Sequence, residues 1–290
     1  VQHHHAHIAA TCAEHGHTGP VLGLALDGVG LGDDGSAWGG ELLVVDGARM
    51  RRVGHLRPLL LPGGDVAARE PWRIGTGVLH FLERSAEISA RWPTAAGASA
   101  LAQLLQRGVH CPPTTSAGRW FDAAAALLGL CSHMDYEAQA AMLLEQAAQA
   151  HIARHGWPAA LAQGWRIQSN AAGLSELDLL PLLGTLADTA RNPASTAQGA
   201  ALFHATLVDA LAQWASTQAL AQGLDTIAFG GGCFLNALLS TKLQAQLQAR
   251  GLRVLRPLRV SPGDGGIALG QAWVAQQFLE NPDHASCTLD

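Results

Sequence analysis

The chain has 290 residues, with 18 basic and 23 acidic side chains and a formal net charge of −5. This acidic balance argues against a general nucleic-acid-binding protein, which typically carries a basic surface. A content of 48% hydrophobic and 14% charged residues excludes a disordered chain and is enough to bury a large core. No stretch reaches the ~18 uninterrupted apolar residues of a membrane span, and no basic-then-apolar leader precedes Val1. We therefore expect neither nucleic acid nor membrane as a partner.

The cysteines and the single lysine argue against two further kinds of protein, those held together by disulfides and those with a lysine-containing phosphate-binding loop. The five cysteines are scattered without a CxxC pair, which is a poor framework for disulfides, so we expect reduced thiols and a cytoplasmic protein. Lys242 is the only lysine, and it does not follow a glycine-rich run. The sequence thus lacks the GxxxxGK(S/T) loop that grips phosphates in many nucleotide-binding proteins. Any nucleotide must be held in another way.

The first elements alternate between helix and strand. Residues 3–14 are predicted to form a helix ended by Gly16, a favourable residue after a helix C-terminus. The apolar run at 21–26 predicts a buried strand, which we expect to break at Asp27 into a glycine-rich loop over 27–35. This order is a strand followed by a loop and a hairpin, rather than a βαβ unit.

The rest of the chain divides into a helical middle and a mixed end. Two strands, at 40–45 and 50–56, should join through Asp46-Gly47, a strong hairpin dipeptide. The final segment predicts strands and helices separated by glycine-rich loops. We therefore expect one catalytic module made of three segments: the rest of a first-lobe sheet at 1–66, a mainly helical middle at 67–221, and second-lobe strands and helices at 222–290.

Histidines are concentrated at the start of the predicted first helix. His3 and His7 are four residues apart, so they project from one helix face at a separation that suits one metal ion. Two imidazoles do not complete a site, and added carboxylates would favour iron, manganese or zinc. His4 and His5 cannot share that face, so they are candidates for supporting or substrate-facing roles. The alternative is a surface helix that happens to be rich in histidine.

Three strand-to-helix or strand-to-loop junctions carry glycines beside a polar residue. Asp27 precedes Gly28 and Gly30, and Asp264 stands among glycines at 263–266. The third junction places the glycines 230–232 ahead of a predicted helix in which Asn236 is expected one turn along, able to reach a base or ribose. Such loops offer backbone N–H groups to phosphates. Each loop alone is also compatible with an ordinary turn.

Two further stretches lead predicted helices. Asp122, four residues after Gly118, could bind a ribose hydroxyl pair or simply favour the helix dipole, and the dipole is the stronger reading from these residues alone. Tyr136, the only tyrosine, lies in an acidic helix start that capping alone explains. Cys233 is a conceivable nucleophile, although a buried structural role is the simpler reading.

The motifs together resemble a known family. The C-terminal domain of the HypF carbamoyltransferases, which mature nickel–iron hydrogenase, is similar in VQHHHAH at 1–7, DGVGLGDDGSAWGGE at 27–41, REPWR at 69–73, GRWFD at 118–122, GGGCFLN at 230–236 and GDGGIALGQ at 263–271. The resemblance implies an α/β, actin/sugar-kinase-like (ribonuclease H-like) fold with two lobes and a large helical insertion. It also implies that the N-terminal part of the first lobe lies before Val1.

The resemblance assigns roles to particular residues. Ala138 departs from it, since a glycine is expected there in a Tyr-Glu-Gly-Gln pattern, and this leaves Tyr136 and Glu137 without an assigned role. A divalent metal, with iron expected and zinc or magnesium as alternatives, would be bound by His3, His7, Asp27 and Asp264. ATP or carbamoyl-adenylate would be bound by Gly28, Gly30, Gly118, Asp122, Gly230, Gly231, Gly232 and Asn236.

The resemblance also implies an activity. The module would transfer a carbamoyl group from carbamoyl-adenylate to the C-terminal cysteine of a hydrogenase-maturation partner, for synthesis of a cyanide ligand, with His4 or His5 as a base toward the thiol. Further N-terminal modules of the same enzyme would make carbamoyl-adenylate. The alternatives are an O-carbamoyltransferase of a small molecule, a tRNA-modifying relative, which the acidic balance disfavours, and a non-catalytic nucleotide-binding scaffold of the same fold.

Overall fold

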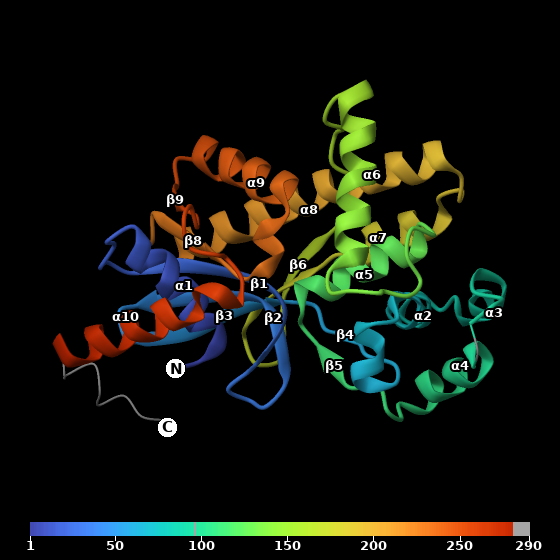
Figure 1. Cartoon of the computed structure of the whole chain (residues 1–290), viewed down its shortest axis with the longest axis horizontal. Coiled ribbons are helices and arrows are strands. Elements are labelled where there is room, and N and C mark those ends of the chain that lie inside the picture. Colours follow the sequence, from blue (N-terminus) through green and yellow to red (C-terminus); the bar gives the residue numbers. More distant parts are fainter. Residues whose placement is uncertain (96, 281–290) are drawn as a thin grey trace. The chain divides into compact units, whose positions relative to one another are not determined.

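The computed structural model describes residues 1–95 and 97–280 (Figure 1). The chain forms two compact units. One comprises Val1–Leu56, Ile167–Leu177 and the described residues from Asp209 onward, and the other comprises Arg57–Arg166 and Asp178–Val208. Four cysteines are free thiols, and Cys287 lies outside the described residues.

The first unit is built on a mixed sheet with the strand order β6-β7-β3-β2-β1-β8-β9. Pairs β1–β2 and β2–β3 are antiparallel, whereas β1–β8, β8–β9 and β3–β7 are parallel. The fold is therefore mixed α/β, as predicted. The strands are β1 (Val21–Leu31), β2 (Ala37–Asp46), β3 (Arg49–Leu56), β6 (Arg166–Ser169), β7 (Ser175–Asp178), β8 (Thr226–Gly230) and β9 (Arg253–Leu255).

Helix α1 (His3–Glu14) confirms the first predicted helix and is buried over most of its length. Gly16, at φ +58°, follows its C-terminus. A Cβ on Gly270 would lie 1.8 Å from the carbonyl oxygen of Ala6, and one on Gly230 would lie 2.9 Å from the carbonyl carbon of His7. Glycine at both positions lets α1 touch α10 and the end of β8 directly. The other helices of this unit are η3 (Gly232–Leu235), α9 (Ala237–Ala249), η4 (Asp264–Gly266) and α10 (Ile267–Glu280).

The second unit is mainly helical. Its short strands β4 (Leu59–Leu60) and β5 (Pro113–Thr114) pair with each other. The helices are η1 (Gly64–Ala68), α2 (Pro71–Phe81), η2 (Ser85–Glu87), α3 (Ile88–Arg91), α4 (Ala98–Arg107), α5 (Ala117–Leu127), α6 (Gln139–His155) and α7 (Leu180–Asp188). Helix α8 (Pro193–Ala221) begins in this unit and ends in the first.

The structure corrects the sequence at β1. The strand does not break at Asp27 but continues to Leu31, because β2 pairs Trp38 with Gly30 after a register shift that follows Leu26. Gly28 and Gly30 therefore lie in a strand rather than in a loop. Pairing along β2 satisfies the backbone at the far end of the glycine-rich stretch, so glycine content alone was misleading.

Two strands of the predicted helical middle were also missed. β7 pairs with β3 through Gly54 and Ser175, and β6 lies next to β7 in the strand order. The short, half-polar segments 166–169 and 175–178 carry little of the apolar periodicity that marks a strand. Pairing of β8 with β1 also joins the first and last predicted segments, 1–66 and 222–290, in one sheet, whereas the sequence placed them in different lobes.

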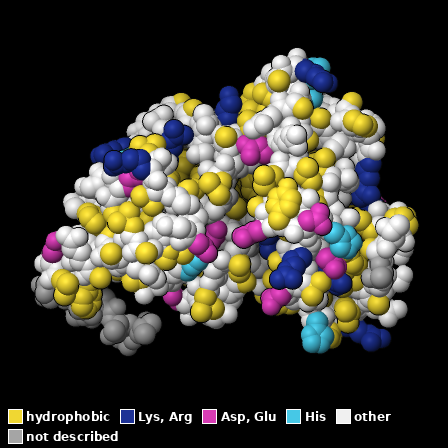
Figure 2. All heavy atoms as spheres, in the orientation of Figure 1, with side chains coloured by type: hydrophobic (Ala, Val, Ile, Leu, Met, Phe, Trp, Pro, Cys, Tyr) yellow, Lys and Arg dark blue, Asp and Glu magenta, His cyan; other side chains and the backbone are white. Residues whose placement is uncertain are grey.

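The surface of the described residues carries charges of both signs (Figure 2), as expected from the nearly balanced numbers of acidic and basic residues. In the described part of the chain, no helix combines the length and apolarity needed to cross a membrane. Figure 2 shows acidic and basic side chains interspersed over the face drawn, with apolar side chains scattered between polar atoms.

Candidate metal centre

Four side chains converge from three elements of the first unit. His3 and His7 come from α1, Asp27 from β1 and Asp264 from the start of η4, and each offers one ligand atom within 4.8 Å of the others. The sequence predicted these four residues as metal ligands, and the structure brings all of them together. Their positions in the chain span more than 250 residues, so the sheet and α1 must form before the cluster exists.

The separations within the cluster match those of atoms around one metal ion. The Nε2 atoms of His3 and His7 are 3.1 Å apart, and Asp27 Oδ2 lies 3.1 Å and 3.4 Å from them. Asp264 Oδ1 lies 3.7 Å and 3.6 Å from the same two nitrogens. Atoms about 2.1 Å from a metal are about 3.0 Å apart in octahedral and about 3.4 Å apart in tetrahedral coordination. The residues therefore fit a divalent cation, and this nitrogen and oxygen set suits iron, manganese or zinc.

The cluster is buried on one side and open on the other. The side chains of His7 and Asp27 are almost entirely buried, and that of His3 is mostly buried. The Asp264 side chain is 77% exposed. Three ligands are thus fixed by the fold, while Asp264 forms the solvent side from which a further ligand can approach.

Asp27 is held as a carboxylate. Burial opposes its ionisation, but hydrogen bonds from the His3 and His7 rings and from the Gly232 N–H outweigh burial and lower the pKa of Asp27 well below its usual value. The hydrogen bond to Asp27 in turn raises the pKa of His3. Asp27 is therefore already in the form that binds a cation.

His4 lies beside the cluster, and both His4 and His5 form their hydrogen bonds outside it. His5 Nε2 is 3.1 Å from the Gly47 carbonyl, so its ring N–H donates to that oxygen. His4 Nδ1 is 3.2 Å from the side-chain nitrogen of Gln2. Burial lowers the pKa of His4 to about 3 and also lowers the pKa of His5. Both rings are therefore neutral near pH 7.

The triple glycine at 230–232 supports Asp27 rather than offering orphan N–H groups. The Gly231 N–H donates to the Pro262 carbonyl at 2.8 Å, and the Gly232 N–H donates to Asp27 Oδ1 at 2.9 Å. A Cβ on Gly231 would lie 2.3 Å from the Leu26 carbonyl oxygen. The N–H groups of Gly231 and Gly232 are therefore already paired, with Pro262 and Asp27, and the binding of a nucleotide by Gly230, Gly231 and Gly232 stays a prediction.

Asn236 is also placed differently from the prediction. It is the N-cap of α9 rather than a residue one turn inside it, and its Oδ1 accepts the Leu239 N–H at 2.9 Å. The cap satisfies one of the donors that the start of a helix leaves without a partner. Its contact with a nucleotide stays a prediction.

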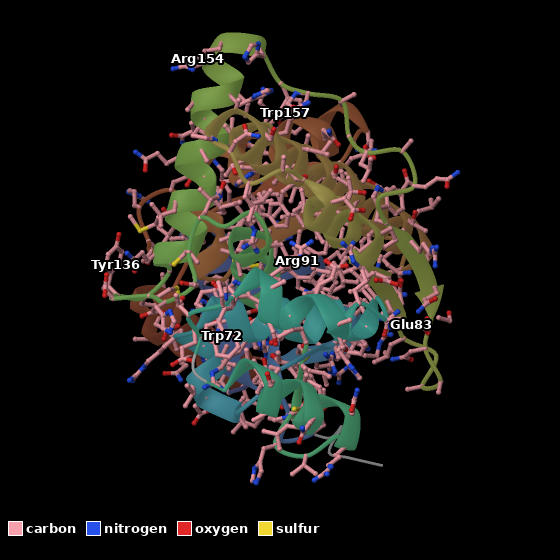
Figure 3. The ribbon with its side chains drawn as sticks, turned by 90° about the vertical axis from the view of Figure 1, so that its right-hand side faces the viewer. Trp72, Glu83, Arg91, Tyr136, Arg154 and Trp157 are labelled. Carbon is pink, nitrogen blue, oxygen red and sulfur yellow. The ribbon has the colours of Figure 1, made fainter. Side chains whose placement is uncertain are left out.

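The remaining nucleotide candidates lie in the second unit. Gly118 is in the first turn of α5, and Asp122 is buried in the next turn with its Oδ2 2.7 Å from Arg119 Nε. Burial raises the pKa of Asp122 to about 6. The ion pair with Arg119, rather than the helix dipole, is the main local interaction of the Asp122 carboxylate. Contact between Asp122 and a ribose stays a prediction. Figure 3 shows Tyr136 ahead of α6 and Arg154 at the other end of that helix.

Sequence reasoning missed a buried polar cluster beside the histidines. Glu41, fully buried in β2, accepts the N–H groups of Gly39 and Gly40, and its other oxygen lies 2.7 Å from Arg52 Nε. The Arg52 guanidinium stacks on the Trp38 ring at 3.8 Å, and Trp38 lies 6.2 Å from the His4 ring. The alternation of apolar and polar residues along a strand does not indicate a buried glutamate, so the sequence pattern could not have predicted the position of Glu41.

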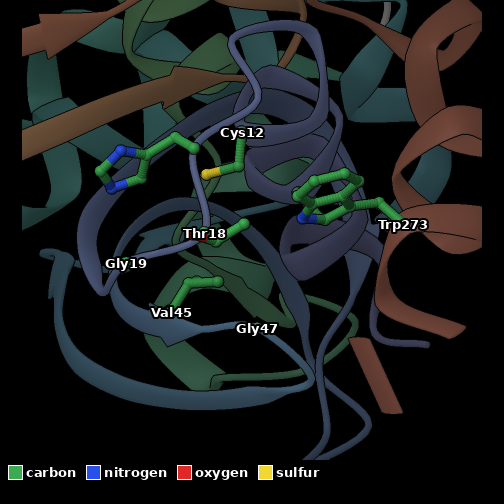
Figure 4. A pocket seen from close by; sticks show the side chains of 8 residues that line it. Cys12, Thr18, Gly19, Val45, Gly47 and Trp273 are labelled. Carbon is green, nitrogen blue, oxygen red and sulfur yellow. The ribbon is translucent and has the colours of Figure 1, made fainter. Parts of the chain in front are cut away.

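A small pocket elsewhere in the first unit is not a substrate site. Figure 4 shows it between Cys12, Val45 and Trp273. Its volume of about 10 Å³ holds no more than a single water molecule. None of the four clustered side chains lines it.

Fold and site together define a mixed-sheet α/β domain with a His/Asp cluster, from α1, β1 and η4, that could hold a metal ion. The family described as "Carbamoyltransferase, Kae1-like domain, second subdomain" matches residues 23–271. The chain belongs to this family, the Kae1-like domain of the HypF carbamoyltransferases, and the resemblance seen in the sequence is confirmed.

Individual relatives support the assignment. The chain is 51% identical to "Carbamoyltransferase HypF2" of Cupriavidus necator, over 97% of the chain and 37% of that relative. It is also 51% identical to "Carbamoyltransferase HypF homolog" of the same organism, over 95% of the chain and 70% of that relative. A crystal structure of full-length HypF in the phosphate- and nucleotide-bound form superposes with a TM-score of 0.84 at 30% identity, over 97% of this chain and 43% of that one. The chain thus spans less than half of that full-length HypF.

Proposed function

We propose that this chain is the carbamoyl-transfer module of a hydrogenase-maturation enzyme, with a two-lobed, actin/sugar-kinase-like fold. It would bind ATP or carbamoyl-adenylate at the His/Asp centre and pass the carbamoyl group to the C-terminal cysteine of a partner protein. The resulting thiocarboxamide would be the precursor of a cyanide ligand. The convergence of His3, His7, Asp27 and Asp264 within 4.8 Å carries the proposal, together with membership of the family.

The ligand geometry suits this chemistry. A divalent cation, with iron preferred and zinc or magnesium as alternatives, would supply a Lewis acid for phosphate and carbamoyl oxygens. His3 and His7 project from successive turns of one buried helix, so their spacing is set before any substrate binds. The Gly232 N–H holds one oxygen of Asp27 and leaves the other facing both imidazoles. Two carboxylates balance the charge of a divalent cation, and exposed Asp264 leaves one side open to substrate.

The nucleotide would lie along β1. A Cβ on Gly28 would meet no atom within 4 Å, so a phosphate can approach the backbone there. Because the chain spans 37% of one relative and 43% of the HypF crystal structure, we assign the making of carbamoyl-adenylate to other modules of the same enzyme. The acceptor would be a separate hydrogenase-maturation protein.

Removing both imidazoles tests the proposal. The double variant His3→Ala/His7→Ala should lose its metal and its carbamoyl transfer together, because two of four ligands disappear. Metal content is measured by elemental analysis. Transfer is measured by mass spectrometry of a peptide that ends in cysteine, with carbamoyl-adenylate supplied.

A matched control is present in α6. His151 and His155 are also four residues apart, with ring centroids 4.7 Å apart, but no carboxylate joins them in a cluster among the described residues. The variant His151→Ala/His155→Ala should keep both metal and transfer. Full transfer by a metal-free His3→Ala/His7→Ala variant would contradict the proposal.

A further inference from the structure

The side chain of Gln2 has a fixed orientation at the start of α1. Its Oε1 accepts the backbone N–H of His5 at 2.8 Å, and its Nε2 donates to the Leu31 carbonyl at 3.1 Å. A backbone N–H can only donate and a carbonyl can only accept, so these two partners identify the amide oxygen and nitrogen of Gln2 without ambiguity.

Gln2 in turn fixes the protonation of His4. The same Gln2 Nε2 lies 3.2 Å from His4 Nδ1. An amide nitrogen only donates, so Nδ1 must accept with its lone pair. A neutral imidazole with a lone pair on Nδ1 carries its hydrogen on Nε2. His4 is therefore a hydrogen-bond donor through Nε2.

That donor is buried and has no hydrogen-bond partner among the residues that the structure describes. His4 as a whole is 0% exposed. A buried donor left without an acceptor is unfavourable, because it has lost its hydrogen bonds to water, so native proteins rarely keep one without a functional reason. The energetic cost points to an acceptor that arrives with a ligand.

The His4 ring lies next to the metal cluster. Ring atom Cε1, which lies between the two ring nitrogens, would be 2.6 Å from a Cβ on Gly30, so the His4 ring packs against β1. The His4 ring meets the His3 ring edge-on, with 5.1 Å between centroids. The unpaired N–H therefore belongs to a buried ring that is packed directly against His3, one of the four clustered side chains.

We propose that His4 is a further catalytic residue, which donates its Nε2–H to an oxygen of the ligand at the metal centre. The oxygen belongs to a carbamoyl carbonyl or to the phosphate joined to it. This inference rests on the proposed function for the identity of the ligand. A fixed donor aimed at an oxygen that gains negative charge stabilises the transition state without reorganisation. His4 thus acts as a donor and not as a base, because Gln2 occupies the lone pair of Nδ1.

The protonation state can be measured without any substrate. Long-range proton–nitrogen NMR spectra of the zinc-loaded, ¹⁵N-histidine-labelled chain distinguish the two neutral tautomers. The His4 signals are assigned by their loss in His4→Gln. We expect hydrogen on Nε2, and hydrogen on Nδ1 would overturn the proposal.

A pair of substitutions separates donation from packing. His4→Leu fills the site without a donor, whereas His4→Gln restores an N–H. Both keep the four metal ligands, so metal content and melting temperature are the checks on folding. We expect His4→Leu to lower carbamoyl transfer about 100-fold and His4→Gln to recover at least a tenth of the wild-type rate. Equal losses in both variants, or no loss in either, would overturn the proposal.

Binding measurements distinguish a carbonyl oxygen from a phosphate oxygen as the acceptor. They also separate a failure of the His4 proposal from a failure of the proposed function. Dissociation constants for carbamoyl-adenylate and for ATP are compared in the wild type and in His4→Leu. Weaker binding of carbamoyl-adenylate alone assigns the carbonyl oxygen, weaker binding of both assigns a phosphate oxygen, and unchanged constants together with an unchanged rate of transfer overturn the proposal. If the wild type binds these ligands but transfers nothing to a cysteine, the proposed function fails while the contrast between variants still decides the role of His4.

Discussion

Gly30 packs against two histidine rings at the candidate metal centre, so adding a single methyl group there should disturb the site. A Cβ at Gly30 would lie 2.4 Å from His3 Cδ2 and 2.6 Å from His4 Cε1. Gly30→Ala must therefore displace the His3 ring. We expect metal affinity to fall about 10- to 100-fold, as for other changes that misorient a ligand. Competition with a chromophoric chelator measures the change.

Gly28, two residues earlier in β1, is the matched control. A Cβ there would meet no atom within 4 Å. Gly28→Ala should leave metal affinity and melting temperature unchanged while weakening ATP binding if the phosphate passes over this backbone. Equal losses of metal affinity in the two variants would show that flexibility of β1, and not the methyl contact, controls the centre.

His204 predicts a pH dependence of stability. It is fully buried in α8, its Nδ1 lies 2.8 Å from the Ala200 carbonyl, and burial lowers its pKa from 6.5 to about 4. In the unfolded chain the His204 ring therefore becomes protonated below about pH 6.5, whereas in the folded chain it becomes protonated only near pH 4. The stabilisation from the neutral ring is complete above pH 6.5 and is lost as the pH falls, by about 3 kcal/mol in total.

Comparison with non-titrating variants isolates this effect. His204→Gln and His204→Phe lack the ionisation, so between pH 7 and pH 5 their unfolding free energies should fall about 2 kcal/mol less than that of the wild type. Urea unfolding at the two pH values gives the difference, and the other titrating groups cancel. Parallel pH profiles for the wild type and both variants would contradict the prediction.

At the scale of elements, sequence patterns predicted the helices and strands whose bounds are set by residues close together in the chain. Helix α1 was predicted because its first residue, its length and the following Gly16 are all encoded within fourteen residues. The end of β1 was not, because its last residues are ordered by pairing with β2 across a turn. β7 was missed because its partner β3 lies more than 100 residues earlier in the chain, and β6 was missed with it because its neighbour in the sheet is β7.

Ala138 precedes the first residue of α6 and stands where the family pattern has a glycine, a difference that the sequence alone did not explain. Its φ of +61° is in the left-handed region, where a Cβ costs about 1 kcal/mol. Glycine, which the family pattern led us to expect there, has no such cost. Ala138→Gly should therefore stabilise the protein by about 0.5–1 kcal/mol in chemical unfolding. Ala150→Gly, at an exposed position inside the same helix, should destabilise it by about 1 kcal/mol, and the same sign for both changes would refute the explanation.

At the scale of the whole molecule, the centre depends on segments that only the fold unites. The resemblance to a family supplied all four clustered residues. Spacing alone could suggest only His3 and His7, because Asp27 and Asp264 are brought to α1 by the pairing of β1 with β8 and by the loop before α10. Supporting groups such as Gln2 and Glu41 depend on three-dimensional contacts, and no linear pattern indicates them.

The location of all four ligands in one unit predicts where metal binding stabilises the chain. A ligand at 100 times its dissociation constant stabilises the state that binds it by about 2.7 kcal/mol. His3, His7, Asp27 and Asp264 all belong to the first unit. Saturation with zinc should therefore slow hydrogen exchange in α1, β1 and α10, while exchange in α2 and α4 of the second unit stays unchanged. Equal slowing in both units would mean that they unfold as one cooperative body, since protection can spread beyond the ligands only if opening of one unit requires opening of the other.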